Sequence, residues 1–197
     1  MGKGELTRQT ILERATTLAS EVGLSGLTIG KLADALGMSK SGLFAHFDSK
    51  ERLELGVLEN AAAVFVDAVV RPALKAPRGV KRVRALFERW LAWPSRAGLQ
   101  GCFFMAVTSE LDDRPGPARE LLVKQQRDWL DTIAHVVRTA VAEGEFRRGL
   151  DVEQFAYELY GIMFMVHHAA RLLADPKAER RARTAFDRLI HSARAAD

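Results

Sequence analysis

The segment LTIGKLADALGMSKSGLFAHFDSKERL, residues 27–53, has the spacing of two short helices joined by a glycine turn. Thr28 is placed to cap the first of these helices, because its hydroxyl can accept a hydrogen bond from an unpaired amide. Gly37 can adopt a positive φ and end that helix, and Ser39 can cap the next one. Two helices joined by three or four residues that include a glycine form a helix-turn-helix. The first helix would bury Ile29, Leu32, Ala33 and Leu36, and the second Leu43 and Phe47.

The other face of the second helix suits a DNA groove. It carries Ser39, Lys40, Ser41, Gly42, Ala45 and His46. Hydroxyls can bond base edges or phosphates, and a lysine can reach a phosphate or a guanine. The amides at the two helix N-termini favour phosphate oxygens. Lys50, in the first turn of the following helix, is placed for a further phosphate. We therefore expect residues 27–53 to form the DNA-reading part of the protein, its head.

Helical spacing recurs along the remaining sequence, and no alternating run indicates a strand. The first helix should begin near Thr7 and end at Gly23, and the third should contain Phe44 and Phe47. A long fourth helix, capped by Ser49, should end near Pro72. Five further helices are expected at 78–95, 101–112, 116–143, 151–173 and 176–194. The predicted fold is therefore all-α, with about nine helices.

Residues 27–53 resemble the tetracycline-repressor (TetR) family of bacterial transcriptional regulators, and the resemblance extends back through RQTILERATTLASEVGLSGLT, residues 8–28. It implies phosphate contacts by Thr28 and Lys50, and a place for Leu43 against a thymine methyl. The residues that it places in or beside the major groove are Ser39, Lys40, Ser41, Gly42 and His46. Phe44 departs from the family pattern, which usually has tyrosine there, so a phosphate-binding hydroxyl is missing.

The resemblance also implies two domains and a homodimer. A DNA-binding domain over 1–50 would be followed by a ligand-binding and dimerisation domain over 51–197. The helices near 151–173 and 176–194 would form a four-helix interface with a second copy. Two reading heads about 34–36 Å apart would then enter successive major grooves of double-stranded DNA at a palindromic operator.

A small-molecule ligand is implied in the same way, and the composition favours an apolar or aromatic one. Thr108, Glu110, Gln126 and His167 are polar groups that could orient it. The apolar candidates are Phe65, Trp90, Trp93, Phe104, Met105, Trp129, Tyr160, Met163 and Phe164. Such a ligand would release the DNA by favouring a conformer with wrongly spaced heads.

Composition sets bounds on these interpretations. The net charge is +4, but residues 1–55 hold seven basic and seven acidic residues, so the prediction of DNA binding depends on where the charges lie and not on their sum.

Catalytic, cofactor and metal motifs are not evident: Cys102 is alone, and His167 and His168 are adjacent and point about 100° apart on a helix. The chain has no signal-like or membrane-spanning run, so we expect a cytoplasmic, non-enzymatic regulator, most often a repressor in this family. The alternative is a helical small-molecule-binding protein or adaptor that has lost DNA binding, which the neutral head and Phe44 would allow.

Overall fold

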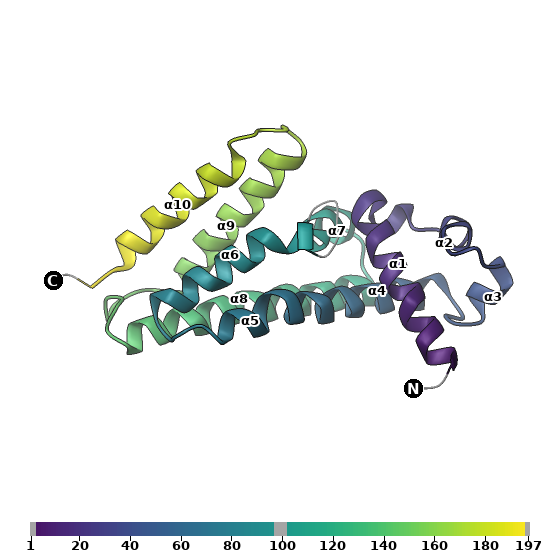
Figure 1. The fold of residues 1–197 in the computed structure, drawn as a ribbon, viewed down its shortest axis with the longest axis horizontal. Helices are drawn as coiled ribbons and strands as arrows, with labels where there is room; N and C mark the ends of the chain where they lie inside the picture. The colour runs from purple at the N-terminus through teal and green to yellow at the C-terminus, as the bar shows by residue number, and fades with distance from the viewer. Residues whose placement is uncertain (1–2, 97–101, 196–197) are drawn as a thin grey trace. The chain divides into compact units, whose positions relative to one another are not determined.

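The computed structural model describes residues 3–96 and 102–195, and their regular structure is helical (Figure 1). The elements are α1 (Lys3–Gly26), α2 (Ile29–Leu36), α3 (Lys40–Phe44), α4 (Lys50–Phe65), the π-helix η1 (Val66–Val70), α5 (Arg71–Leu74), α6 (Val80–Arg96), α7 (Phe103–Leu111), α8 (Pro117–Ala142), α9 (Val152–Arg171) and α10 (Ala178–Ala193). A single isolated bridge, between Phe146 and Arg194, is the exception within these ranges. The first residue of the helix predicted at 101–112 lies outside the described residues.

The predicted fourth helix is a continuous helical run made of α4, η1 and α5. Counted as one, it gives nine helices among the described residues, as predicted. The run continues past the expected end at Pro72 to Leu74. Pro72 comes directly after the π-helical turn η1, where the regular α-helical hydrogen-bond pattern is already interrupted. The all-α prediction is confirmed.

The chain divides into two compact units, which we describe separately. The first comprises Met1–Phe65 and Pro94–Lys124, and the second comprises Val66–Trp93 and Gln125–Asp197. The divisions fall at the junction of α4 and η1, within α6 after Trp93, and within α8 after Lys124. Within the described ranges, no helix is long and apolar enough to cross a membrane.

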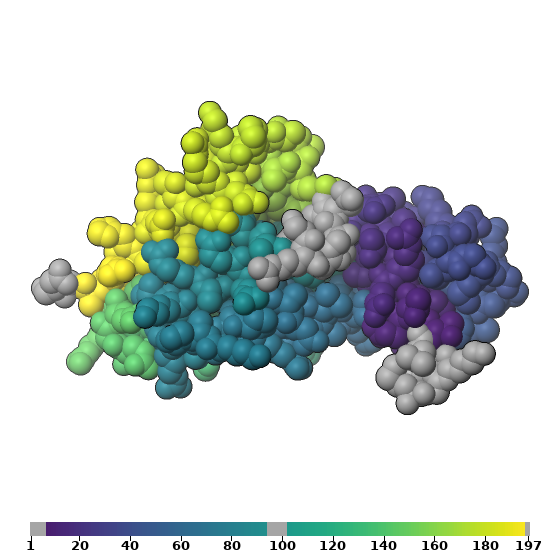
Figure 2. Space-filling view, in the orientation of Figure 1, coloured from purple at the N-terminus to yellow at the C-terminus, as the bar shows by residue number. Residues whose placement is uncertain are grey.

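In the first unit, α1 packs against α2, α4 and α7, and α2 packs against α3. Figure 2 shows the side chains of α1, α2 and α3 packed side by side on the face in view. A polar network crosses the α1–α4 contact: the Gln9 side-chain amide donates to Asn60 Oδ1 at 3.0 Å, and Asn60 Nδ2 donates to Thr16 Oγ1 at 2.9 Å. Asn60 and Thr16 are buried, and these bonds satisfy polar groups that would otherwise be costly to bury. The shared core contains Ile11, Ala15, Ala19, Leu32, Leu43, Phe47, Leu53 and Val57.

Helix α1 begins before the predicted Thr7 and contains a break at Gly23. Gly23 has φ 73° and ψ 171°, so two helical pieces meet there, and the predicted end is an internal break. The backbone amide of Ser25, just after the break, donates to Glu110 Oε2 of α7 at 2.8 Å. Glu110 therefore holds the end of α1.

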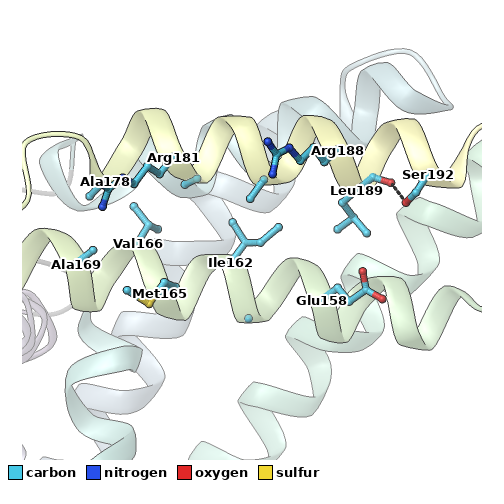
Figure 3. A pocket seen from close by; sticks show the side chains of 13 residues that line it. Glu158, Ile162, Met165, Val166, Ala169, Ala178, Arg181, Arg188, Leu189 and Ser192 are labelled. Carbon is cyan, nitrogen blue, oxygen red and sulfur yellow. Dashed lines mark hydrogen bonds between the residues drawn. The ribbon is translucent and has the colours of Figure 1, made fainter.

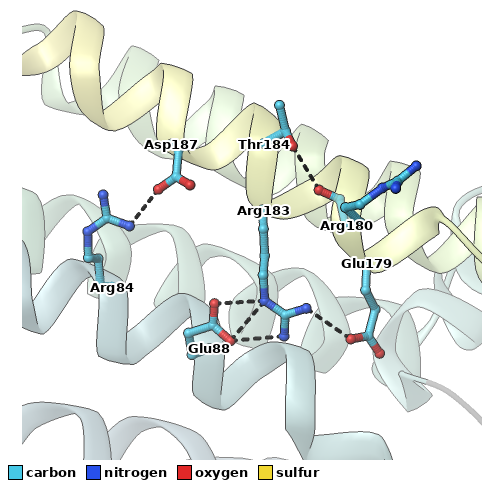
Figure 4. Close-up of polar contacts among 7 residues, drawn as sticks. All are labelled: Arg84, Glu88, Glu179, Arg180, Arg183, Thr184 and Asp187. Atoms are coloured by element: carbon cyan, nitrogen blue, oxygen red, sulfur yellow. Dashed lines mark hydrogen bonds and ion pairs between the residues drawn. The ribbon is translucent and has the colours of Figure 1, made fainter.

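In the second unit, α9 packs against α10. Helix α10 is joined to α6 by a stacked ring pair and by the ion pairs shown in Figure 4. Phe87 and Phe186 stack with ring centroids 4.2 Å apart. Arg183 donates to both carboxylate oxygens of Glu88, with Nε–Oε1 and Nη2–Oε2 distances of 3.1 Å. Paired donors of this kind fix geometry as well as charge, so α10 is held in a defined register on α6.

Candidate nucleic-acid interface and regulatory unit

Local capping builds the helix-turn-helix as the sequence predicts. Thr28 Oγ1 accepts from the Lys31 amide at 3.2 Å at the start of α2. Gly37 has φ 63° and ends α2, and its amide points to the carbonyls of Ala33 and Asp34. Ser39 Oγ accepts from the Gly42 amide at 3.1 Å and starts α3.

Helix α3 is shorter than predicted, because it ends at Phe44 and does not include Phe47. The next residues form tight turns, in which the His46 amide donates to the Leu43 carbonyl and the Phe47 amide to the Phe44 carbonyl, both at 3.1 Å. These i→i+3 bonds tighten the chain at the helix end. They direct Phe47 into the core, where its side chain is 2% exposed.

The residues predicted to meet DNA differ in exposure. Thr28, Ser39, Lys40, Ser41 and Lys50 are exposed, Gly42 and His46 are half-buried, and Phe44 is 47% exposed. Leu43 is 0% exposed, because it packs in the core between α2 and α3. A thymine methyl cannot reach a side chain in that position, so Leu43 serves as the anchor of α3.

Lys40 and Thr28 come together over the first turn of α2. A Cβ placed on Gly30 would lie 3.5 Å from Lys40 Cε and 3.9 Å from Thr28 Oγ1. The ammonium of α3 therefore lies beside the N-terminus of α2, where the positive end of the helix dipole also favours an anion. Two of the residues predicted to contact DNA, Thr28 and Lys40, thus both lie beside Gly30.

Lys50 is not a free cation. Its Nζ lies 3.5 Å from Oε1 of Glu54, one helical turn along α4. Arg114, between α7 and α8, donates from Nη2 to Glu54 Oε2 at 3.0 Å and to Oε1 at 3.4 Å. The Glu54 side chain is 2% exposed, so one buried carboxylate is shared by two cations that are each about half exposed. The Lys50–Glu54 spacing was visible in the sequence, but nothing in the sequence pointed to Arg114.

Five of the predicted ligand residues lie in the first unit. Phe65, Phe104 and Met105 are buried, and the rings of Phe65 and Phe104 meet edge to face at 5.7 Å. The Thr108 hydroxyl donates to the Phe104 carbonyl at 2.7 Å, so it is engaged within its own helix. Glu110, the other polar candidate there, is bound to the Ser25 amide.

The other eight lie in the second unit. The buried members are Trp90, Trp93, Trp129 and Met163. The Tyr160 hydroxyl donates to Gln126 Oε1, and the Tyr160 ring meets Phe164 edge to face at 5.0 Å. Burial, with smaller effects of Arg171 and His168, lowers the pKa of His167 below its usual 6.5, so its imidazole is neutral at pH 7. The second unit thus holds several aromatic side chains together with the hydrogen-bonded pair Tyr160–Gln126 and the neutral imidazole of His167.

A groove of about 720 Å³ runs between α9 and α10, on the two helices predicted to form the dimer (Figure 3). Small side chains line much of it, and Ile162, Met165 and Val166 add larger apolar surface. Glu158, Arg181 and Arg188 supply charge along it. Met165 is 55% exposed, so part of this apolar surface is uncovered in the single chain.

Comparison with known proteins assigns the class to which this head and helical unit belong. The family model "Bacterial regulatory proteins, tetR family" matches residues 11–55, and the model "Tetracyclin repressor-like, C-terminal domain" matches residues 79–186. The second match alone covers more than half of the chain. The chain belongs to the TetR family of transcriptional regulators.

Individual relatives agree with that assignment. The chain is 26% identical over 148 residues to the HTH-type transcriptional repressor KstR2 of Mycolicibacterium smegmatis, covering 74% of this chain and 70% of that protein. It is similar in structure to a TetR transcriptional regulator from Chloroflexus aurantiacus, with a TM-score of 0.88, 26% identity and full coverage of both chains. The regulator AibR, solved in complex with isovaleryl coenzyme A and operator DNA, has the same fold, with a TM-score of 0.71 and 20% identity over 94% of this chain and 97% of AibR.

Proposed function

We propose that this regulator binds a palindromic operator in double-stranded DNA as a homodimer, represses transcription there, and is released by a small apolar or aromatic ligand. The exposed, doubly capped helix-turn-helix is the observation that carries the proposal. Thr28 and Lys40 would hold one phosphate at the start of α2, and Lys50 another. Ser39, Ser41, Gly42 and His46 would lie in or beside the major groove, and Phe44 would pack on the DNA backbone.

The groove between α9 and α10 supports the homodimer. Its small residues allow close approach of helices from a second copy, and its exposed apolar surface gives a reason for that approach. Closed two-fold pairing would turn one reading head into two, which matches a palindrome. The predicted domains, 1–50 for DNA and 51–197 for ligand and dimer, fit this division of roles, and a regulator of a bacterial promoter would act in the cytoplasm.

The aromatic side chains of the second unit support a ligand. The neutral His167 and the Tyr160–Gln126 pair could orient a polar group among apolar rings. AibR was solved with both isovaleryl coenzyme A and operator DNA, and KstR2 is a transcriptional repressor. Both are consistent with a repressor that a ligand releases, and direct repression is the simplest consequence of operator binding.

The proposal is tested by selecting bound sequences from a random DNA pool with the full-length protein. We expect an enriched palindrome whose binding weakens steeply with salt. Lys40→Ala should weaken binding to that palindrome by about tenfold, the value of one charge-assisted hydrogen bond, without changing the dimer. Lys81→Ala, on α6 in the second unit, removes the same charge outside the helix-turn-helix and is the matched control. Failure to enrich any sequence at low salt would refute operator binding and leave the small-molecule-binding alternative.

A further inference from the structure

The buried carboxylate of Glu54 competes with DNA for Lys50. The Lys50 ammonium is about half exposed, but it lies 3.5 Å from a carboxylate that is itself shielded from water and attracts it. A phosphate can take Lys50 away only if Glu54 keeps another partner, since a buried charge left unpaired is costly. The structure provides that partner in Arg114.

We infer that Arg114 is a positioning residue for operator binding, which neutralises Glu54 and thereby frees Lys50 to bind a DNA phosphate. Arg114 contacts both carboxylate oxygens, at 3.0 and 3.4 Å, whereas Lys50 contacts one. A guanidinium bonded to both oxygens satisfies the carboxylate after the ammonium has turned away. This inference rests on the proposed phosphate contact of Lys50.

The position of Arg114 in the chain also couples Lys50 to the segment between α7 and α8. It lies between α7 and α8, 60 residues after Glu54 in the sequence. Glu110, near the end of α7, holds the Ser25 amide of α1 in the same unit. Through Arg114, a displacement of the α7–α8 segment changes a DNA contact, because Lys50 returns to Glu54 when Arg114 withdraws.

The test measures affinity for the selected palindrome by fluorescence anisotropy over a series of salt concentrations. Arg114→Gln should weaken binding by about tenfold or more, the size of one lost charge-assisted contact. It should also reduce the salt slope by about 0.9 for each phosphate contact that is lost. Arg114→Lys keeps the charge and should retain most of the affinity. Arg71→Gln, whose guanidinium pairs with Asp67 at 3.0 Å outside the α7–α8 segment, is the matched control and should bind as the wild type does.

Second-site variants separate this role from a structural one. Glu54→Gln removes the competitor, so it should bind as tightly as the wild type or more tightly, and Glu54→Gln combined with Arg114→Gln should recover the affinity lost by Arg114→Gln. In a Lys50→Gln background, Arg114→Gln should change affinity less than about twofold, because the contact that it protects is already gone.

Three results would overturn the inference while the wild type still binds its palindrome. They are a double variant as weak as Arg114→Gln, a Glu54→Gln variant weaker than the wild type, or an undiminished effect of Arg114→Gln without Lys50. A wild type that binds no sequence would instead refute the proposed function. Thermal unfolding of each variant shows whether the protein is folded. If Arg114→Gln alone does not fold, the variant that combines Glu54→Gln with Arg114→Gln remains informative, because it leaves no unpaired buried carboxylate.

Discussion

Gly23→Ala should destabilise the first unit far more than the same change at Gly37. Gly23 has φ 73° and ψ 171°, a region that is essentially restricted to glycine, and a non-glycine residue there costs about 2 kcal/mol. A Cβ at this position would also lie 1.8 Å from Glu110 Oε1. The Glu110 carboxylate must then move, and its 2.8 Å bond from the Ser25 amide, worth about 1 kcal/mol, is lost.

The expected total is about 3 kcal/mol, which corresponds to a fall in Tm of about 6–12 °C for a chain of this size. Gly37→Ala is the matched control, because Gly37 also has a positive φ of 63° but has nothing within 4 Å of an added Cβ. Its cost is that of one left-handed residue, about 1 kcal/mol. Circular dichroism with thermal and urea unfolding measures both changes.

Measuring Gly23→Ala with and without Glu110→Ala separates the loss of the Ser25–Glu110 bond from the backbone strain at Gly23. Glu110→Ala alone should cost about 1 kcal/mol, and Gly23→Ala should cost about 1 kcal/mol less in that background, since the bond is already absent. The reasoning is refuted if Gly23→Ala is no more destabilising than Gly37→Ala, or if the effects of Gly23→Ala and Glu110→Ala simply add.

Three other predictions concern the head, the dimer and pH. Phe44→Tyr adds a hydroxyl to a side chain that is 47% exposed, so operator affinity should rise by about tenfold through a phosphate hydrogen bond, and an unchanged or weaker affinity by anisotropy would contradict the placement of Phe44 beside the backbone. Met165→Arg places a charge in the α9–α10 groove and should raise the dimer dissociation constant by at least about tenfold in sedimentation velocity, whereas Leu74→Arg, on α5, should not; a dimer that persists would move the interface elsewhere. Because burial lowers the pKa of His167 in the folded state, the unfolded state binds the proton more readily below the usual pKa of 6.5, and stability is lost as the pH falls through and below that value. His167→Gln should therefore reduce the loss of unfolding free energy between about pH 7.5 and about pH 5.5, measured with urea, and an unchanged loss would exclude this histidine as its source.

Sequence reasoning succeeds here where a feature depends on neighbours in the chain. Thr28, Gly37 and Ser39 act within three or four residues of themselves, so the helix-turn-helix and its caps follow from residue type and spacing. The same local logic places most helix ends within a few residues. It overextends α3, because the burial of Phe47 depends on the core that other helices provide.

The remaining features depend on residues far apart in the chain. Ser25 meets Glu110 across 85 residues, and Glu54 meets Arg114 across 60, with no periodic pattern to connect either pair. The predicted ligand residues share residue type and not a position in the fold, and the structure divides them between two units. The π-helical turn at Val66–Val70 has no glycine or proline within it that would mark it in the sequence.

The balanced charge of residues 1–55 has a consequence for how the protein is distributed in a cell. Residues 1–55 carry balanced charge, Arg52 is paired with Asp48 at 3.4 Å, and the Arg8 guanidinium lies over the Phe47 ring. Affinity for arbitrary DNA comes from cations that replace counterions on phosphates, and a chromosome offers about 10⁶–10⁹ competing sites. A head with few such cations loses little of its population to bulk DNA. A small number of copies can then occupy the operator, and molecules released by a ligand do not linger on the neighbouring chromosome.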